Sequence, residues 1–432
     1  MNGIFFAIVL VSFLAAAWRQ LTWSAPAGKD AVSPMQALAN GMVETAGSSV
    51  TLAIGLVGVM ALFLGLMKVA EEGGILRIIA KTIRPLMVRL FPDVPAHHPA
   101  MGAMIMNMSA NALALGNAAT PFGIRAMQEL DNLNAHKGTA SNAMVLFLAI
   151  NTSSVTLLPT GVIALRAAAG STDPAGILPT TLFATVCSTT IAILACLFLQ
   201  RRWKSAADVT PEPETEHAMP DGAAEVIPEV AEASYPAWIS ALALAGIVAL
   251  IPITILFGRQ ISPWIIPGLM VALLGFGVAK KVRIYEAFIE GAKDGFNVAI
   301  RIIPYLVAIL VAVGMFRASG ALDVMIAAIG PLTSLVGMPP EALPMALLRP
   351  LSGSGAYGVL ASIIQDPAIG PDSYAGYLVS TIQGSTETTF YVLAVYFGAV
   401  QIRRIRHALV AALCADFAGI AAAVFICSLL YG

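Results

Sequence analysis

Residues Thr381–Tyr391 read TIQGSTETTFY and lie inside an apolar run, Tyr374–Phe397, that is long enough to cross a membrane. A spanning helix needs about twenty mainly apolar residues, whereas this run carries Gly384, several hydroxyls and the carboxylate of Glu387 at its middle. A carboxylate at that depth is costly and is interpreted as functional. The pattern predicts a helix that breaks in mid-membrane and lines a polar cavity, because unpaired backbone persists only there. The alternative is a Glu387 that pairs with a cation only to hold helices together.

The composition sets the class of protein. Of 432 residues, 58% are hydrophobic and 11% are charged, with a mean hydropathy of +0.82, whereas soluble domains carry about a quarter charged residues. We therefore expect an all-α polytopic membrane protein; the resemblance described below implies the bacterial cytoplasmic (inner) membrane. The net charge of −1 gives no indication of a nucleic-acid partner. The four cysteines lie in apolar runs without metal-ligand spacing, so we expect no metal site and no cofactor.

Apolar runs predict about nine transmembrane helices. These are Asn2–Trp18, Val50–Met67, Asn142–Leu165, Thr180–Leu199, Ala237–Phe257, Ile265–Ala279, Ala299–Phe316, Tyr374–Phe397 and His407–Leu430. Segments expected outside the bilayer core, at its surface or as short helices, are Met35–Gly47, Lys68–Phe91, Ile284–Asn297 and Leu322–Val336, the last broken at Gly330-Pro331. Two more apolar runs are interrupted by polar residues and predict re-entrant hairpins, Ala100–Thr120 and Leu343–Ile364.

An acidic segment divides the chain into two halves. Residues 205–236 hold eight acidic residues, five prolines and no Lys or Arg, which predicts a solvated linker, with a partner-binding tail as the weaker alternative. The predicted domains are therefore 1–204 and 237–432. The halves repeat each other: GGILRIIAKTIRPL, residues 73–86, resembles SGALDVMIAAIGPL, residues 319–332.

The two repeats are expected to be inverted relative to each other. Their first spans, Val50–Met67 and Ala299–Phe316, are separated by an odd number of predicted crossings. The stretch Lys68–Lys137 holds seven Lys or Arg, whereas the corresponding Arg317–Ser373 holds two. Because basic residues mark the cytoplasmic side, these stretches should face opposite sides. This places the N-terminus inside and the C-terminus outside.

Inverted repeats are frequent among secondary transporters and bring broken helices together near the bilayer midplane. Half-helix N-termini there offer N–H groups to anions, while carbonyls and hydroxyls can coordinate Na⁺ or polar solute groups. The candidate substrate-binding residues are Asn107, Ser109 and Asn111 at the first hairpin tip; Asn151, Thr152, Ser153 and Ser154 in the first broken helix; Arg349, Ser352 and Ser354 at the second tip; and Gln383, Ser385, Thr386, Glu387 and Thr388 in the second broken helix.

Arg349 needs a partner at such depth, and Glu387 is the expected one. Two interpretations stay open: a structural pair, or an Arg349 that meets an anionic solute while Glu387 takes a proton or cation. Asp416 is expected to bond to a Ser or Thr rather than relay protons. The small residues Ala411, Ala415, Gly419 and Ala423 suggest close helix packing, with a homodimer contact as one interpretation.

Two motifs resemble a known family. NMSANALALGNAATPFGIRAMQELDNLN, residues 107–134, resembles spore maturation protein A, and GSTETTFYVLAVYFGAVQIRRIRHAL, residues 384–409, resembles spore maturation protein B. The chain looks like a fusion of the two, joined by the acidic linker. Both belong to the nucleoside-recognition, or Gate, group, which is similar to concentrative nucleoside transporters. This resemblance implies a scaffold and a transport domain that move relative to each other as an elevator.

We therefore expect transport of a small polar solute, either anionic or nucleoside-like, through the lipid bilayer by alternating access. Coupling to Na⁺ or H⁺ is left open. The alternative is a non-transporting membrane scaffold or a regulator of envelope or spore maturation. An enzyme is not expected, because the sequence places no Ser–His or metal arrangement at a common depth.

Overall fold

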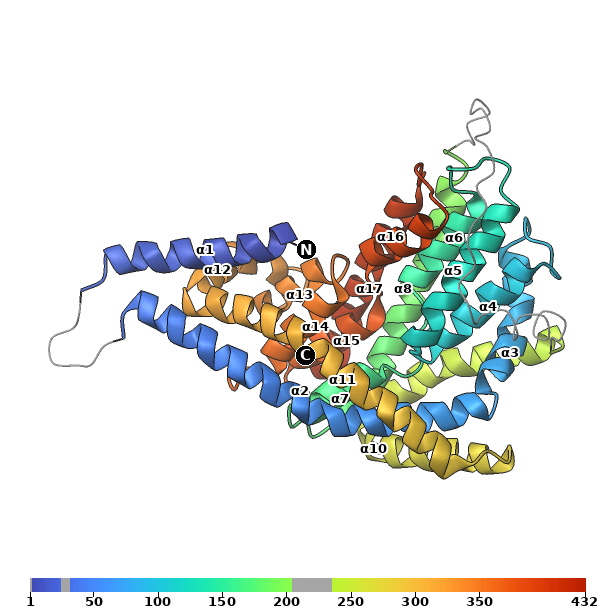
Figure 1. Ribbon diagram of the computed structural model, residues 1–432, viewed down its shortest axis with the longest axis horizontal. Helices are drawn as coiled ribbons and strands as arrows, with labels where there is room; N and C mark the ends of the chain where they lie inside the picture. The colour runs from blue at the N-terminus through green and yellow to red at the C-terminus, as the bar shows by residue number, and fades with distance from the viewer. Residues whose placement is uncertain (1, 25–31, 204–234) are drawn as a thin grey trace.

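The computed structural model describes residues 2–24, 32–203 and 235–432, and the regular elements in these ranges are helices (Figure 1). Those before the acidic segment are α1 (Asn2–Leu21), α2 (Pro34–Glu72), α3 (Ile75–Leu90), α4 (Pro99–Ala112), α5 (Gly116–Asn132), α6 (Asn142–Thr152), α7 (Thr160–Ala168), the short η1 (Pro174–Gly176) and α8 (Ile177–Leu199). Those after it are α10 (Ala237–Ala279), α11 (Ile284–Ala318), α12 (Ala321–Ser334), η2 (Pro340–Ala342), α13 (Leu343–Leu348), α14 (Gly353–Ile364), α15 (Tyr374–Ser385), α16 (Thr389–Ala399) and α17 (Ala408–Tyr431).

The chain is an all-α membrane protein. Among the described residues, three helical stretches are long and apolar enough by themselves to cross a membrane: Pro34–Glu72, Pro174–Leu199 and Ala408–Tyr431. Shorter apolar helices accompany them, including 5–21, 142–152 and 353–364. The acidic segment predicted as a linker lies outside the described residues, except for Tyr235 and Pro236.

Both interrupted helices break where the sequence predicted, and a helix–turn–helix pair occupies each segment predicted as a hairpin. The predicted tip of the first hairpin is wrong, because Asn107, Ser109 and Asn111 lie within α4, before the turn, and α5 continues past Thr120 to Asn132. In the first hairpin, α4 and α5 pack against each other around a turn at residues 113–115, and in the second, residues 349–352 separate α13 from α14. The first broken helix is α6 followed by α7, with the break at 153–159, and the second is α15 followed by α16, with the break at 386–388. Ser or Thr occurs at both breaks and Ser352 at the second turn, whereas the first turn, Leu113-Ala114-Leu115, is apolar and lies between Asn111 and Gly116.

Other predicted boundaries are wrong. Met35–Gly47 and Val50–Met67 belong to one helix, α2, and Ile284–Asn297 and Ala299–Phe316 belong to one helix, α11. The serines at 48 and 49 do not interrupt α2, because both hydroxyls donate to the carbonyl of Thr45 and leave the backbone ladder intact. The helix α12 likewise continues through Gly330-Pro331.

The expected spans Ala237–Phe257 and Ile265–Ala279 are the two arms of one helix, α10. A straight helix of 43 residues would extend about 65 Å. Lys280, which follows α10, nevertheless lines the same cavity as Tyr235, which precedes it, so the helix folds back on itself. Figure 1 shows the arms running in opposite directions. Prolines, the usual cause of sharp helix bends, occur in its sequence at 252, 263 and 267.

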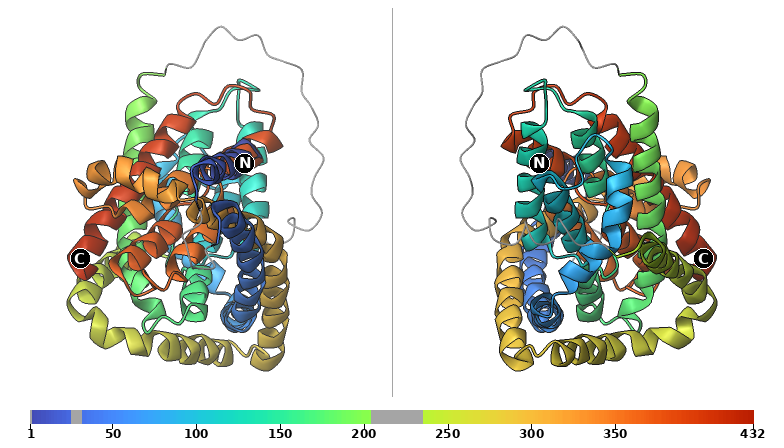
Figure 2. Two further views of the ribbon diagram at one scale, coloured as in Figure 1. Left: turned by 90° about the vertical axis from the view of Figure 1, so that its left-hand side faces the viewer. Right: turned by 90° about the vertical axis from the view of Figure 1, so that its right-hand side faces the viewer.

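The helices α2 and α11 form a long antiparallel pair, seen side by side in Figures 1 and 2. Thr45 lies beside Gly314, and Ala61 lies beside Gly295, near the other end of the contact. A Cβ on Gly291 would come within 2.4 Å of the Leu64 carbonyl oxygen. Gly291 and Gly295 therefore provide a small-residue seam that lets the two backbones approach closely.

Two hydrophobic cores are each built from both halves of the chain. One core joins α3–α6 to α16 and the start of α17, and the other joins α7 to α11, α13–α15 and the end of α17. Each broken helix thus has one segment in each core, and its break lies where the cores meet. This arrangement places both breaks at the centre of the molecule.

We predict that Gly291→Ala lowers the stability of the purified protein by about 1–3 kcal/mol, because the added methyl collides with backbone. Thermal unfolding in detergent measures the change. Gly58→Ala on α2 is the matched control, since a Cβ there meets nothing within 4 Å, and it should leave the melting temperature unchanged or higher. Equal melting temperatures for the two variants would contradict the close approach of α2 and α11.

Candidate functional site

The two breaks contact each other directly through the backbone. The N–H of Glu387 donates to the carbonyl of Thr152 over 2.8 Å. Each break also bonds to the hairpin of its own half: Leu157 N–H donates to Ala112 O over 2.9 Å, and Phe390 N–H donates to Pro350 O over 3.2 Å. Groups that the interrupted helices leave free are thereby satisfied inside the protein, as burial requires.

Several predicted site hydroxyls are buried and bond to their own helices. Their bonds run from Ser109 to Ile105 O, from Thr152 and Ser153 to Ala149 O, and from Ser385 to Ile382 O, at 2.8–3.1 Å. Ser352 caps α14 by accepting from the N–H of Gly355 over 3.0 Å, and Ser354 is exposed. Ser154 is buried at 8% exposure. These side chains shape the breaks and tips and do not line the cavity described below.

A second polar cluster joins the first hairpin to the first broken helix. Asn111 Nδ2 donates to Asn151 Oδ1 over 2.8 Å, and Asn107 Nδ2 donates to Ala119 O over 2.7 Å. Asn107 also donates to the hydroxyl of Tyr396 over 3.2 Å, which connects α4 to α16. Sequence reasoning missed Tyr396, because a tyrosine in an apolar run is most simply interpreted as a packing residue. Of the three asparagines, Asn111 reaches the cavity.

Arg349 ties the second hairpin tip to the second break. Its Nη1 donates to Thr388 Oγ1 over 3.0 Å, its Nη2 donates to the carbonyl of Thr386, and Nη2 lies 3.6 Å from Glu387 Oε2. The Arg349 side chain is 4% exposed, whereas that of Glu387 is 53% exposed. The expected ion pair is therefore present, yet the Glu387 carboxylate remains accessible while the Arg349 guanidinium is held by Thr386 and Thr388.

A cavity of about 640 Å³ lies between these tips and breaks and the pair α2–α11. Four predicted site residues line it: Asn111, Arg349, Gln383 and Glu387. The opposite wall contributes three charged residues that sequence reasoning missed, Lys68 and Glu71 on α2 and Asp294 on α11. They were missed because these segments were assigned to the membrane surface, where charges are ordinary. The cavity therefore has polar groups from both halves on one side and charges from the long helices on the other.

Asp416 is buried in α17 and accepts from Thr389 Oγ1 over 2.7 Å, which confirms the expected bond to a hydroxyl. The small-residue stripe of α17 is also buried. Ser188 on α8 donates to the Ala415 carbonyl over 2.8 Å, and a Cβ on Gly419 would collide with Thr386 and Ser188. The interpretation of this stripe as a homodimer contact is therefore wrong, because it is filled within the chain.

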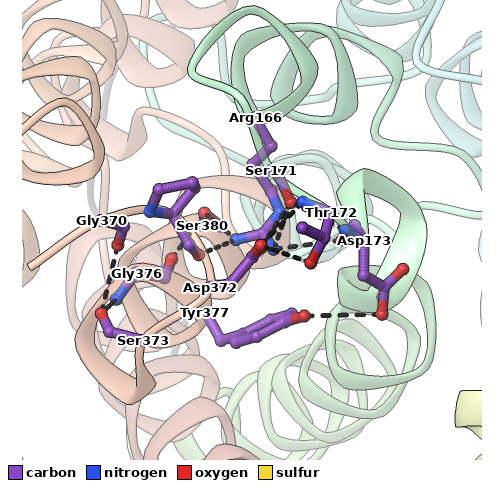
Figure 3. A network of polar contacts seen from close by, with 12 residues as sticks. Arg166, Ser171, Thr172, Asp173, Gly370, Asp372, Ser373, Gly376, Tyr377 and Ser380 are labelled. Atoms are coloured by element: carbon purple, nitrogen blue, oxygen red, sulfur yellow. Dashed lines mark hydrogen bonds and ion pairs between the residues drawn. The ribbon is translucent and has the colours of Figure 1, made fainter.

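Figure 3 shows a network that the sequence did not reveal, centred on the fully buried Arg166 of α7. Its guanidinium pairs with Asp372 at 3.0 Å, donates to the Pro371 carbonyl, and stacks 4.2 Å from the ring centre of Tyr377. Asp372 also accepts from Thr172, both N–H and hydroxyl, over 2.7 Å. The network fastens α7 and the loop after it to the loop before α15, and so joins the two halves of the chain.

Comparisons with known proteins match parts of both halves of the chain. The family model Gate, described as nucleoside recognition, matches residues 53–169 and 299–403, one match in each half. Spore maturation protein B of Bacillus subtilis (strain 168) is 48% identical over 167 residues, which are 39% of this chain and 93% of that protein. Spore maturation protein A of the same organism is 42% identical over 170 residues, 39% of this chain and 87% of that protein.

Among solved structures, a variant of CNTnw in an outward-facing state aligns over 100% of both chains with a TM-score of 0.43 and 12% identity. A TM-score below 0.5 does not by itself establish a common fold. The relationship of the chain to other proteins therefore rests on the sequence matches to the Gate model and to the two spore maturation proteins.

The Arg166 network predicts a pH dependence of stability. Partial burial alone would raise the pKa of Asp372, but hydrogen bonds from Ser171 and Thr172 and the charge of Arg166 lower it overall. A carboxylate whose pKa is lower in the folded state stabilises the fold above its unfolded pKa, about 3.9, and loses that contribution as pH falls further. The melting-temperature difference between wild type and Asp372→Asn should therefore be constant from pH 7 to pH 5 and shrink below about pH 4.

Asp93→Asn is the matched control, since Asp93 lies exposed in the loop between α3 and α4. A difference between wild type and Asp372→Asn that stays constant down to pH 3, or that grows there, would contradict the assigned role of the network.

Proposed function

Because the chain belongs to the Gate family of nucleoside-recognition proteins, we propose that it is a multi-pass membrane transporter that moves a small polar solute by alternating access. One observation carries this proposal: Asn111 of the first hairpin, Arg349 of the second hairpin, and Gln383 and Glu387 of the second broken helix meet in one cavity of about 640 Å³. A volume of that size suits a small molecule. The family and the helical membrane fold favour a transporter-type protein over an enzyme.

The charges around the cavity favour a neutral, hydrogen-bonding solute of the nucleoside class over an anion. The cavity holds three carboxylates, those of Glu71, Asp294 and Glu387. Its two cations are already engaged, since Arg349 bonds to Thr386 and Thr388 and Lys68 lies 3.7 Å from Glu71. An anion would meet uncompensated negative charge there, whereas a neutral solute can bond to the Asn111 and Gln383 amides and to the Glu387 carboxylate.

The proposed movement is of the elevator type. The hairpins and broken helices would move together against the pair α2–α11, which forms the opposite wall of the cavity. The antiparallel course of α2 and α11, equivalent helices of the two halves, supports inverted repeats, and with them about nine crossings with the N-terminus inside. Coupling to Na⁺ or H⁺ and a place in the bacterial inner membrane are further parts of this proposal.

A second function is favoured by a different observation. The two relatives, each matched over most of its length, are named for spore maturation, and most of the predicted site residues are packed into internal hydrogen bonds. A non-transporting scaffold or regulator of envelope or spore maturation would need such a rigid polar centre but no solute. Ligand binding at the cavity separates the two functions.

We predict that Glu387→Gln lowers affinity for the solute by roughly 10- to 100-fold, because the hydrogen bond to a charged acceptor is lost. Stability should change by no more than about 1 kcal/mol, since Glu387 is half-exposed and solvent screens its ion pair with Arg349. Thermal-shift screening of the purified protein against nucleosides and dicarboxylates supplies the ligand. A ligand at 100 times its Kd adds about 2.7 kcal/mol of stability.

Glu286→Gln is the control, because Glu286 is exposed on α11 and does not line the cavity. Unchanged binding by Glu387→Gln would remove Glu387 from the solute site. A screen in which wild type is stabilised by no nucleoside or dicarboxylate, and is not stabilised by Na⁺, would favour the scaffold function.

A further inference from the structure

A groove lies along α3 at the point where both ends of α10 return to it. Figure 1 shows the start of α10 beside α3, and the Tyr235 N–H bonds to the Lys81 carbonyl over 3.4 Å. One cavity of about 400 Å³ and another of about 560 Å³ adjoin here, with Tyr235 in the wall of both. The first of these cavities shares Glu71 with the central cavity that contains Glu387 and Arg349, whereas the second shares no lining residue with it.

The walls of this groove are rich in basic side chains. Arg77, Lys81 and Arg84 follow one another on one face of α3, at spacings of four and three residues. The basic residues that line the two cavities are Arg77, Lys81 and Lys280 in the first and Arg84, Arg89 and His97 in the second. The carboxylates present, Glu71 and Glu72, lie in the first cavity, and Glu71 is already 3.7 Å from Lys68. The second cavity is lined by basic, aromatic and apolar residues alone.

Arg84 is the most informative of these residues. Arg84 as a whole is 8% exposed, and its Nη2 donates to the Ala96 carbonyl over 3.1 Å. Its Nε is buried and, within the described part of the chain, makes no hydrogen bond. Arg84 thus brings to the wall of the second cavity a cation that the fold holds in place, which suits the binding of an oxyanion.

Apolar surface adjoins the same groove. Trp238 is 68% exposed and Leu242 is 66% exposed on the first two turns of α10, directly after Tyr235. Leu86 on α3 is 41% exposed. Exposed tryptophan is typical of the membrane–water interface. The groove thus combines cations for a phosphate with apolar surface for an acyl chain.

We propose that the α3–α10 groove binds an anionic phospholipid, with its phosphate between Lys81, Arg84 and Arg89 and its acyl chains against Trp238 and Leu242. Clusters of Lys and Arg next to membrane helices attract anionic lipids, each residue contributing about 1 kcal/mol, and basic pockets between helices hold their head groups. The exposed apolar residues Trp238, Leu242 and Leu86 favour a lipid over other anions, since free phosphate or an acidic peptide would not bury them. This inference does not depend on the proposed transport.

The test uses the full-length protein, delipidated in a neutral detergent, and dioctanoyl phosphatidylglycerol as the probe. Melting temperature is followed against lipid concentration, with dioctanoyl phosphatidylcholine as the lipid of equal chain length. The variant is Lys81→Gln with Arg89→Gln, and Arg201→Gln with Arg202→Gln at the end of α8 is the control of equal charge change. Phosphatidylglycerol should stabilise wild type and the control at roughly tenfold lower concentration than it does the α3 variant.

Trp238→Ala should weaken phosphatidylglycerol binding as well, which separates a lipid from a bare phosphate. Three results would overturn the proposal: equal stabilisation by the two lipids, equal phosphatidylglycerol binding by wild type and the α3 variant, or stabilisation by inorganic phosphate at the same concentration as the lipid. A fourth is lipid binding that appears only after the eight acidic residues of 205–236 are changed to amides, because the acidic segment would then be the occupant of the groove.

Discussion

The structure depends on one requirement: a helix that stops inside a membrane must find partners for the backbone groups it leaves free. Here the two interrupted helices supply those partners to each other. The Glu387 N–H bonds to the Thr152 carbonyl, and each break also bonds to its neighbouring hairpin. The breaks are consequently held together at the junction of two cores, and the cavity beside them is bounded by segments from both halves.

The same requirement explains why so many polar residues near the breaks do not face the cavity. Ser109, Thr152 and Ser153 donate to carbonyls one turn earlier in their own helices. Arg349 is likewise engaged with Thr386 and Thr388. What remains exposed is Glu387, and the partly buried side chains of Asn111 and Gln383 line the cavity beside it. The polar side chains near the breaks are therefore of two kinds: those that bond to irregular backbone, and those that remain available to a ligand.

Sequence reasoning located the hairpins and the breaks because the signal is local: Gly, Asn, Ser and Thr interrupt runs that are otherwise apolar. It missed features set by distant contacts. Lys68 and Asp294 line the cavity only because α2 and α11 continue past the predicted ends of their spans. Arg166 is buried by a loop about 200 residues away. No local pattern distinguishes such residues from charges at a membrane surface.

The sharing of each core between the halves has a consequence for biosynthesis. The carbonyl of Thr152 is inserted long before Glu387, its partner, has been translated. Residues 100–200 therefore remain incompletely packed in the bilayer until the last third of the chain has been inserted. Contacts of such long sequence separation form late and slowly. A fragment that ended after the first half would leave the Thr152 carbonyl without its Glu387 partner inside the membrane.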